Sequence, residues 1–223
     1  KIIRGIMKNI FFITLMISTL FFMQSCSTEE DSTAATTSSQ TMTDSTGASV
    51  SLDGTYLIDC AASGSAYVKY EVVLSGTTFT FTEAAFSDDT CATGTYSFIA
   101  AWTFTVGSAT TTSGSDNSSK NDLAVTKIDY ALQSASMTIL SDTLATSFNS
   151  SSVYGFTDWA NGTAKSVLGL NGDGTTDNTS FVGAVSYDIW YINGTSFQYG
   201  GGSADTSSTY PTELDYSYVY TKQ

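Results

Sequence analysis

The sequence predicts an all-β domain over residues 52–223, a single antiparallel up-and-down barrel or half-barrel of about eight to ten strands. Apolar and polar residues alternate with a period of two over most of this region, which is typical of strands that bury one face. Pairs such as Ser75-Gly76 and Asn193-Gly194 separate the alternating runs and indicate hairpin turns. A two-sheet sandwich would give a similar pattern and is the alternative fold.

A short apolar run near the N-terminus leads to a cysteine. Residues 10–23 are almost wholly apolar, follow a lysine-containing start, and are followed by Ser25 and Cys26. This run is shorter than the roughly 20 residues that span a bilayer, and a small residue before cysteine is typical of a lipid-modified cleavage site. We expect residues 1–25 to be a signal peptide, including the residues upstream of Met7. Cys26 would carry the lipid and anchor the protein at the bacterial outer membrane or cell surface. An uncleaved membrane anchor is the alternative.

The segment that follows predicts a tether. Residues 26–51 are acidic at first and then consist almost entirely of Ser, Thr, Ala, Gly, Gln and Asp. Because such a composition offers little apolar surface to offset chain entropy, we expect a flexible, disordered linker between the lipid and the barrel.

Charge composition limits the partners of the chain beyond residue 25. That part has five lysines against 21 acidic residues, a formal charge of −16, and contains no arginine or histidine. Nucleic acid and anionic headgroups are poor partners for such a surface. The absence of histidine also excludes a histidine-based triad or zinc site.

Two cysteines remain after Cys26. In an exported chain, an even pair such as Cys60 and Cys91 is most simply a disulfide. Two free or metal-binding thiols are the alternative, but a soft metal would need further ligands that the sequence lacks. We therefore predict a disulfide.

Alternation continues along the domain, and a polar stretch at 108–121 predicts an exposed loop. No segment shows a helical stripe longer than a few residues. The apolar positions expected to share one face of each strand are Phe79 and Phe81; Tyr96, Phe98, Ala100, Trp102, Phe104 and Val106; Ile128, Tyr130 and Leu132; Phe181, Val185, Tyr187, Ile189 and Tyr191; and Leu214, Tyr216, Tyr218 and Tyr220.

Short motifs in this region resemble two related groups of proteins. Gly54-Thr55-Tyr56 resembles the Gly-x-Trp start of the lipocalins. More of the chain, most of residues 52–222, resembles bacterial relatives of the APCDD family, whose ectodomain is a lipocalin-like half-barrel. The resemblance implies a barrel with an apolar, lipid-capable cavity. The motifs that carry it are Gly54-Thr55-Tyr56 before Cys60, Phe86-Ser87-Asp88 before Cys91, Gly94-Thr95-Tyr96, Trp159, Phe197-Gln198-Tyr199-Gly200 and Tyr210-Pro211-Thr212-Glu213-Leu214.

Aromatic residues indicate where a ligand would lie. The chain has 13 Tyr, 13 Phe and 3 Trp, and Phe98, Trp102 and Phe104 fall on one face of a single predicted strand. A barrel of about eight strands can enclose one small ligand, and binding sites combine apolar walls with a few polar groups. We predict that these three rings line a site for an apolar or amphiphilic small molecule. A filled core is the alternative.

One loop resembles a calcium-binding loop. In 171–177, Asn171, Asp173, the carbonyl of Thr175 and Asp177 could supply oxygen ligands around the turn at Gly174. The first and twelfth loop positions lack the usual carboxylates, so the sequence predicts at most a weak calcium site. A tight turn explains the same residues.

No catalytic motif is present. Glu71, Glu83, Asp188 and Glu213 lie in or beside predicted strands, where a carboxylate pair could serve glycoside hydrolysis. We expect a protein that is not an enzyme: a lipid-anchored barrel that binds a small molecule, without nucleic acid as a partner. A structural or adhesive surface module that contacts glycan or protein is the alternative.

Overall fold

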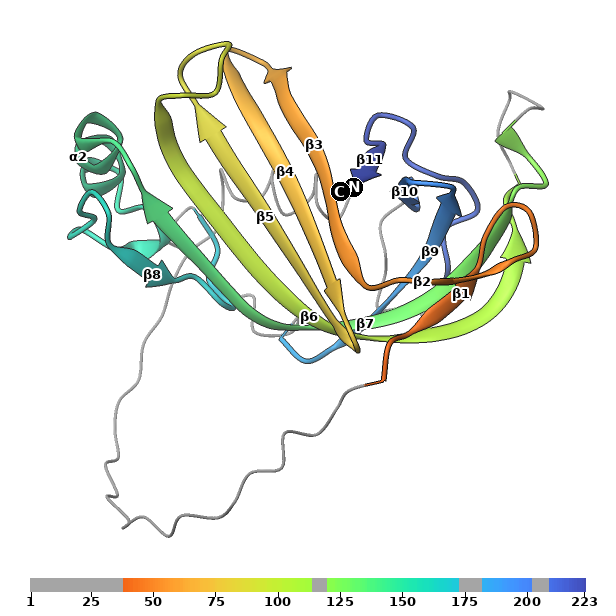
Figure 1. Cartoon of the computed structure of the whole chain (residues 1–223). Coiled ribbons are helices and arrows are strands. Elements are labelled where there is room, and N and C mark those ends of the chain that lie inside the picture. Colours follow the sequence, from red (N-terminus) through yellow and green to blue (C-terminus); the bar gives the residue numbers. More distant parts are fainter. Residues whose placement is uncertain (1–37, 114–119, 173–181, 202–208) are drawn as a thin grey trace, which may run out of the picture.

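The computed structural model describes residues 38–113, 120–172, 182–201 and 209–223. Eight of the described strands form a closed antiparallel up-and-down barrel (Figure 1), which confirms the all-β barrel prediction. Cys26 lies outside the described residues. The barrel strands, in order around the wall, are β6 (Gly94–Thr111), β5 (Thr78–Phe86), β4 (Ala66–Ser75), β3 (Gly54–Ser63), β11 (Tyr220–Lys222), β10 (Ser196–Tyr199), β9 (Val185–Asn193) and β7 (Ala124–Ile139), which pairs again with β6.

The predicted alternation and turns are confirmed in the first strands. Buried positions recur every second residue along β4 and β5. The hairpins β3–β4, β4–β5 and β9–β10 each turn through two residues. Gly76 and Gly194 begin two of these turns with φ values of 55° and 59°. Because glycine adopts a positive φ without steric cost, these residues fix the hairpin register.

The hairpin of β6 and β7 is the longest part of the wall and bends across the barrel (Figure 1). Register shifts interrupt its pairing at residues 101–102 and 106–109, and such bulges increase local bend and twist. Since β6 continues to Thr111, the expected exposed loop over 108–121 is wrong for its first four residues. Residues 114–119 lie outside the described part.

The inward face of β9 differs from the prediction. Trp190 and Ile192 point into the main core, whereas Ile189 belongs to a second apolar cluster outside the barrel. Val185 is exposed. The expected set of odd-numbered residues was wrong as a core face because both faces of this strand carry apolar residues, so alternation alone did not identify the inner one. Phe181 lies outside the described residues.

The C-terminal segment is also shorter as a strand than expected. Only Tyr220–Lys222 forms β11, and Leu214 instead makes an isolated bridge with Gly200. Residues 209–216 cross the outer face of β9, where Leu214 packs against Val125 and Ile189. Two register pairs on each side of β11 join β10 to β3 and close the barrel.

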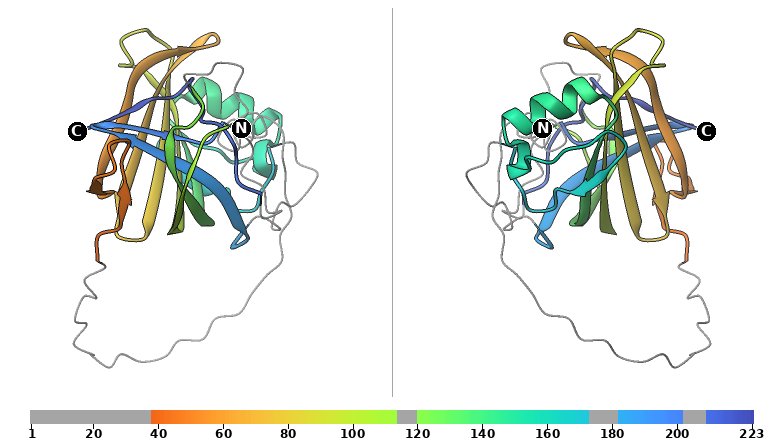
Figure 2. Two further views of the ribbon diagram at one scale, coloured as in Figure 1. Left: turned by 90° about the vertical axis from the view of Figure 1, so that its right-hand side faces the viewer. Right: turned by 90° about the vertical axis from the view of Figure 1, so that its left-hand side faces the viewer.

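A short helix that the sequence analysis missed lies beside the barrel. Helix α2 (Asp142–Ser150) is followed by a 3₁₀ turn, η2 (Val153–Gly155), and by β8 (Ala164–Ser166), which pairs with β7. In the right-hand view of Figure 2, α2 lies in front of the barrel. The Ser141 side chain accepts from the Leu144 N–H and caps the helix. Nine residues rich in Ser and Thr carry too few turns to show a helical stripe.

The end of the expected tether is ordered. A two-stranded hairpin, β1 (Thr41–Thr43) and β2 (Ser49–Ser51), lies within the region predicted to be a flexible linker. Met42 is buried in the main core. The turn is held by Asp44, whose carboxylate accepts from Thr46 and Ala48. The Ser45 N–H also donates to the Ile192 carbonyl of β9 at 3.0 Å, so this short polar segment is tied to the barrel.

The predicted disulfide is confirmed. Cys60 in β3 is bonded to Cys91, and their Cα atoms are 5.8 Å apart. Cys91 lies in a tight loop in which Asp88 accepts hydrogen bonds from the backbone N–H groups of Thr90, Ala92 and Thr93. A further hydrogen bond from the Thr90 hydroxyl lowers the pKa of Asp88 most, and the bonds from the Ala92 and Thr93 N–H groups lower it further.

Candidate functional site

Two of the three residues predicted to bind a ligand lie in a dense network of aromatic rings. Trp102 stacks on Phe79 with ring centroids 4.9 Å apart, and Phe104 lies 5.1 Å from Trp190. All four side chains are buried. Tyr130, Phe197 and Tyr199 extend the network by further ring contacts. This part of the barrel is occupied by its own side chains.

Phe98 lies in a different setting, beside a buried acid. Tyr70 in β4, Glu83 in β5, Phe98 in β6 and Met137 in β7 are paired in one row across four adjacent strands. Directly opposed residues point to the same face of a sheet. Since Tyr70, Phe98 and Met137 belong to the main core, Glu83 also points into the barrel.

Small residues flank this row. Ala85, Ala100 and Ala135 each lie two positions along a strand from Glu83, Phe98 and Met137, respectively, and all three alanines are buried. Residues two apart share a face. Phe81, Tyr96 and Ile139 lie two positions away in the other direction, so each of the three residues has one small and one large neighbour along its strand.

Glu83 is only half satisfied by the protein. The Tyr96 hydroxyl donates a hydrogen bond to Oε1 of Glu83. Among the described residues, Oε2 of Glu83 and the hydroxyl of Tyr154 have no hydrogen-bond partner, although the two side chains are only 4% and 2% exposed. Buried polar atoms normally have a partner. Burial raises the pKa of Glu83, and the hydrogen bond from Tyr96 opposes that shift.

The backbone around Tyr154 holds its ring in the interior. Ser152 and Tyr154 have φ values of 49° and 52°, in the left-handed region that non-glycine residues rarely adopt. Trp159 supports this turn by donating its indole N–H to the Val153 carbonyl at 3.0 Å. Burial, followed by the charge of Glu83, raises the pKa of Tyr154.

No cation of the described chain neutralises Glu83, because its five lysines interact elsewhere. Lys69 pairs with Asp59 at 3.2 Å, and Lys165 pairs with Asp158 at 2.9 Å. The remaining three, Lys120, Lys127 and Lys222, lie over the rings of Tyr216, Tyr210 and Tyr56. Glu83 is therefore a buried carboxyl without an internal counter-ion among the described residues.

Asp188 is a second buried acid inside the barrel, and backbone N–H groups satisfy its Oδ1 atom. Its Oδ1 accepts from the N–H groups of Ile189 at 2.7 Å and Gly200 at 3.0 Å. Burial raises its pKa to about 7, and these hydrogen bonds oppose the shift. A Cβ atom at Gly200 would lie 2.4 Å from Oδ1 of Asp188, so only glycine fits there.

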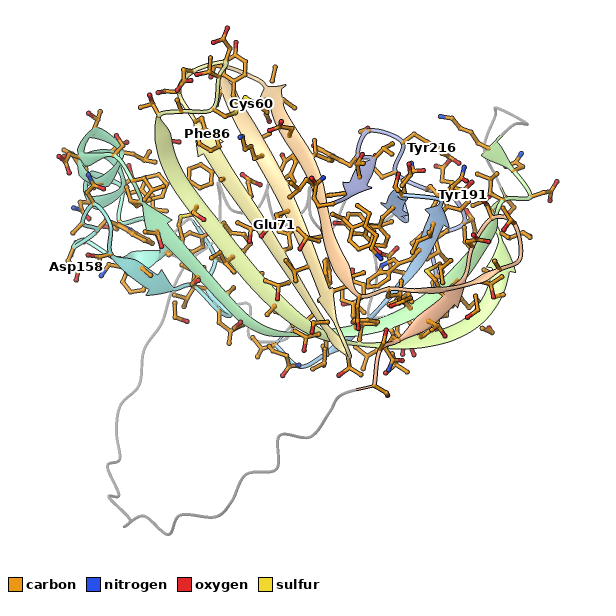
Figure 3. The ribbon with its side chains drawn as sticks, in the orientation of Figure 1. Cys60, Glu71, Phe86, Asp158, Tyr191 and Tyr216 are labelled. Carbon is orange, nitrogen blue, oxygen red and sulfur yellow. A yellow bond between two sulfur atoms is a disulfide. The ribbon has the colours of Figure 1, made fainter. Side chains whose placement is uncertain are left out.

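An open groove of about 470 Å³ lies on the outer surface of β3, β4 and β5, next to β11. Glu71 of β4, on this wall in Figure 3, lines it together with Thr82, and the Lys69–Asp59 ion pair lies beside them. The groove is solvent-facing, and its ion pair is exposed. Such pairs contribute little binding energy.

A second aromatic group lies outside the barrel on β9 and the C-terminal segment. Tyr187 and Tyr210 have ring centroids 5.3 Å apart, and Tyr191 and Tyr216, labelled in Figure 3, belong to the outer apolar cluster. The Tyr210 hydroxyl donates to Asp129. Burial and this hydrogen bond raise the pKa of Tyr210 to about 12.

The predicted calcium loop falls mostly outside the described residues. Asp173, Thr175 and Asp177 are not described, and Asn171 is buried at the end of the preceding segment. In the described part of the chain, no three His, Cys, Asp or Glu side chains gather into a possible metal site. Weak calcium binding at this loop stays a prediction.

Comparison with known proteins gives no assignment. No protein-family model matches the chain, and no curated protein matches it in sequence. None of the described helices is both long and apolar enough to cross a bilayer.

Sequence reasoning named Glu83 and Asp188 only as acids in strands and missed Tyr70, Tyr96 and Tyr154 as neighbours of Glu83. One signal was available: Glu83 follows Phe79 and Phe81 at the same spacing of two. That spacing places the acid on the inner face. Tyr154 carried no comparable signal, because it enters the site from a loop about 70 residues further along.

Proposed function

We propose that the barrel binds an apolar or amphiphilic small molecule, and that the protein is a lipid-anchored component of the bacterial outer membrane or cell surface. The observation that carries the proposal is the half-satisfied Glu83 on an otherwise apolar inner wall. A few polar groups set into apolar walls are the usual composition of a small-molecule site. Phe98, next to Glu83 in the same row, supplies an apolar contact.

The closed barrel supports this proposal because eight strands enclose space for side chains or one small ligand. The ring network around Trp102 and Phe104 fills one part of that space. The ligand would therefore occupy the part bounded by Glu83, Phe98 and Tyr154. Trp102 and Phe104 would form the base of the site instead of its polar end.

The cellular location rests on the N-terminal sequence alone. Cys26 and the apolar run before it fit a lipoprotein signal, and the short motifs that resemble the APCDD family and the lipocalins fit a ligand-carrying barrel at the envelope. If Cys26 is lipidated, Cys26→Ala should release the protein from the membrane fraction.

Native mass spectrometry of the full chain, purified from bacterial membranes, tests the binding function. A co-purified small molecule, or displacement of a fluorescent fatty-acid or retinoid probe, is the expected result. A protein that carries no molecule and ignores every such probe would contradict the proposal. In that case an unlabelled competitor would cause no change in probe fluorescence, because no probe would be bound.

The outer tyrosines favour a second candidate, a surface module that contacts glycan. Tyr187, Tyr210 and Tyr216 are half-buried outside the barrel, beside Asp129 and two lysines. Aromatic faces bordered by polar groups can stack on sugar rings. Retention of the protein on a polysaccharide affinity gel, lost in Tyr216→Ala, would support this candidate.

A further inference from the structure

We infer that the ligand carries a protonated amine, which the barrel holds between Oε2 of Glu83 and the hydroxyl of Tyr154. This inference rests on the proposed small-molecule function and specifies its chemistry. Both atoms are buried, and neither has a partner among the described residues. An ammonium group donates up to three hydrogen bonds and can therefore satisfy both.

The charge balance at this site favours a cation. Glu83 has no counter-ion among the described residues, because the five lysines interact elsewhere. A buried carboxylate is costly unless it is paired and hydrogen-bonded. A guest ammonium group supplies both the opposite charge and the missing donor. An alcohol supplies only a donor, and a carboxylate adds a second negative charge.

The surrounding rings fit a cation with an apolar tail. Tyr70 lies next to Glu83 in the same row, 5.8 Å from Phe81 and 5.4 Å from Tyr218 between ring centroids. Aromatic faces attract ammonium groups, more strongly where water is excluded. Phe98 and the neighbouring alanines provide apolar surface for a short alkyl chain.

Binding should depend on pH through Glu83. The titratable groups near it are tyrosines: Tyr70 from β4, Tyr96 from β6, Tyr154 from η2, and Tyr220 from β11, with Tyr218 packed on Tyr70. The pKa values of Tyr70, Tyr96, Tyr154 and Tyr220 are raised, mainly by burial, so these groups stay neutral near neutral pH. Amine affinity should fall as the pH drops through the pKa of Glu83 and the carboxylate is protonated.

The test compares three soluble probes of equal chain length: octylamine, octanol and octanoate. Their binding to the purified full chain is followed by calorimetry and by intrinsic tryptophan fluorescence. Octylamine should bind about tenfold to a hundredfold more tightly than octanol, the range expected for a hydrogen bond to a charged group, and octanoate should bind most weakly.

Glu83→Gln should remove the preference for octylamine, because the amide keeps an acceptor for Tyr96 but carries no charge. Glu71→Gln is the matched control: it makes the same change on the outer face of the adjacent strand and should leave the preference intact. Tyr154→Phe should weaken octylamine several-fold without affecting octanol. It also provides a readout that does not depend on how Glu83→Gln folds.

The outcomes separate this inference from the proposed function. Octanol or octanoate binding as tightly as octylamine would overturn the amine inference and leave a small-molecule site in place. The amine inference also fails if Glu83→Gln folds and keeps the preference, or if Tyr154→Phe binds octylamine as the wild type does. If none of the three probes binds and no fatty-acid or retinoid probe binds, both proposals fail.

Discussion

Glu83 and Asp188 are both buried carboxyl groups inside one barrel, but the protein satisfies them differently. Oδ1 of Asp188 accepts from two backbone N–H groups, and a side chain larger than that of glycine at position 200 would collide with this atom. Glu83 accepts from one side chain, Tyr96, and its other oxygen has no partner among the described residues. Asp188 therefore has a structural role in the barrel, whereas Oε2 of Glu83 can accept a hydrogen bond from a ligand.

The surroundings of the two acids follow the same division. Near Asp188, Trp190 contacts Phe79, Phe104 and Phe197 in a continuous ring network. Near Glu83, the neighbours are Tyr70 and Phe98 on the adjacent strands and Phe81 and Ala85 along its own strand, and Tyr154 lies in a turn with positive φ values. Strained backbone is often kept where it serves a function. The comparison indicates that the interior near Asp188 serves packing, whereas the interior near Glu83 serves ligand recognition.

The largest expected effect is at the packed end. Trp102→Ala should destabilise the protein by roughly 3–5 kcal/mol, because it removes a buried ring stacked on Phe79. Urea unfolding followed by circular dichroism measures the loss. A loss below about 1 kcal/mol, accompanied by failure to bind a fatty-acid probe, would instead show that Trp102 serves ligand binding more than packing.

Asp188 should make stability depend on pH. Its pKa is about 7 in the folded protein against 3.8 ordinarily. The folded state therefore holds the proton more tightly, so this contribution is fully present below about pH 4 and is lost as the pH rises to about 7. The difference corresponds to at most about 4 kcal/mol.

Asp188→Asn removes this charge and keeps an acceptor for the Gly200 N–H. The variant should gain stability over wild type at pH 8 and show little gain at pH 4. Chemical unfolding at both pH values gives the two differences. Equal differences at the two pH values would show that Asp188 is not the titrating group.

Gly200→Ala probes the same end through sterics. The added methyl group would lie 2.4 Å from Asp188 Oδ1 and 2.7 Å from Pro211 Cγ, and overpacking of this kind costs roughly 1–3 kcal/mol. Gly162→Ala is the control, since its Cβ would meet nothing within 4 Å and only its φ of +76° is unfavourable. Thermal unfolding should rank Gly200→Ala as the more damaging change; the reverse order would contradict the close contact.

The smallest effect is expected at the recognition end. Tyr154→Phe removes a buried hydroxyl that has no partner among the described residues, so stability should change by less than about 1 kcal/mol and should not fall. Calorimetric unfolding compares the variant with Tyr96→Phe, which breaks the hydrogen bond to Glu83 and should be the less stable of the two. A marked loss in Tyr154→Phe would mean that its hydroxyl has a structural role.

Local chemistry allowed part of the structure to be predicted. Period-two alternation identified β5 and the inner face of β6, Gly76 marked the β4–β5 turn and Gly194 marked the β9–β10 turn, because these features depend on near neighbours in sequence. The presence of two cysteines beyond Cys26, in a chain expected to be exported, predicted the Cys60–Cys91 disulfide. By the same logic, spacing alone could have placed Glu83 on the inner face.

Tertiary structure decided the rest. Which face of β9 points inward depended on which of its two apolar faces the C-terminal segment covers. Helix α2 depended on a cap and on packing against the barrel. A short stretch of sequence contains neither kind of information. The sequence by itself determined the strands and their turns. Gly200 reaches Asp188 through the local β9–β10 hairpin, whereas only tertiary packing buries Tyr154, which comes from η2 about 70 residues beyond Glu83.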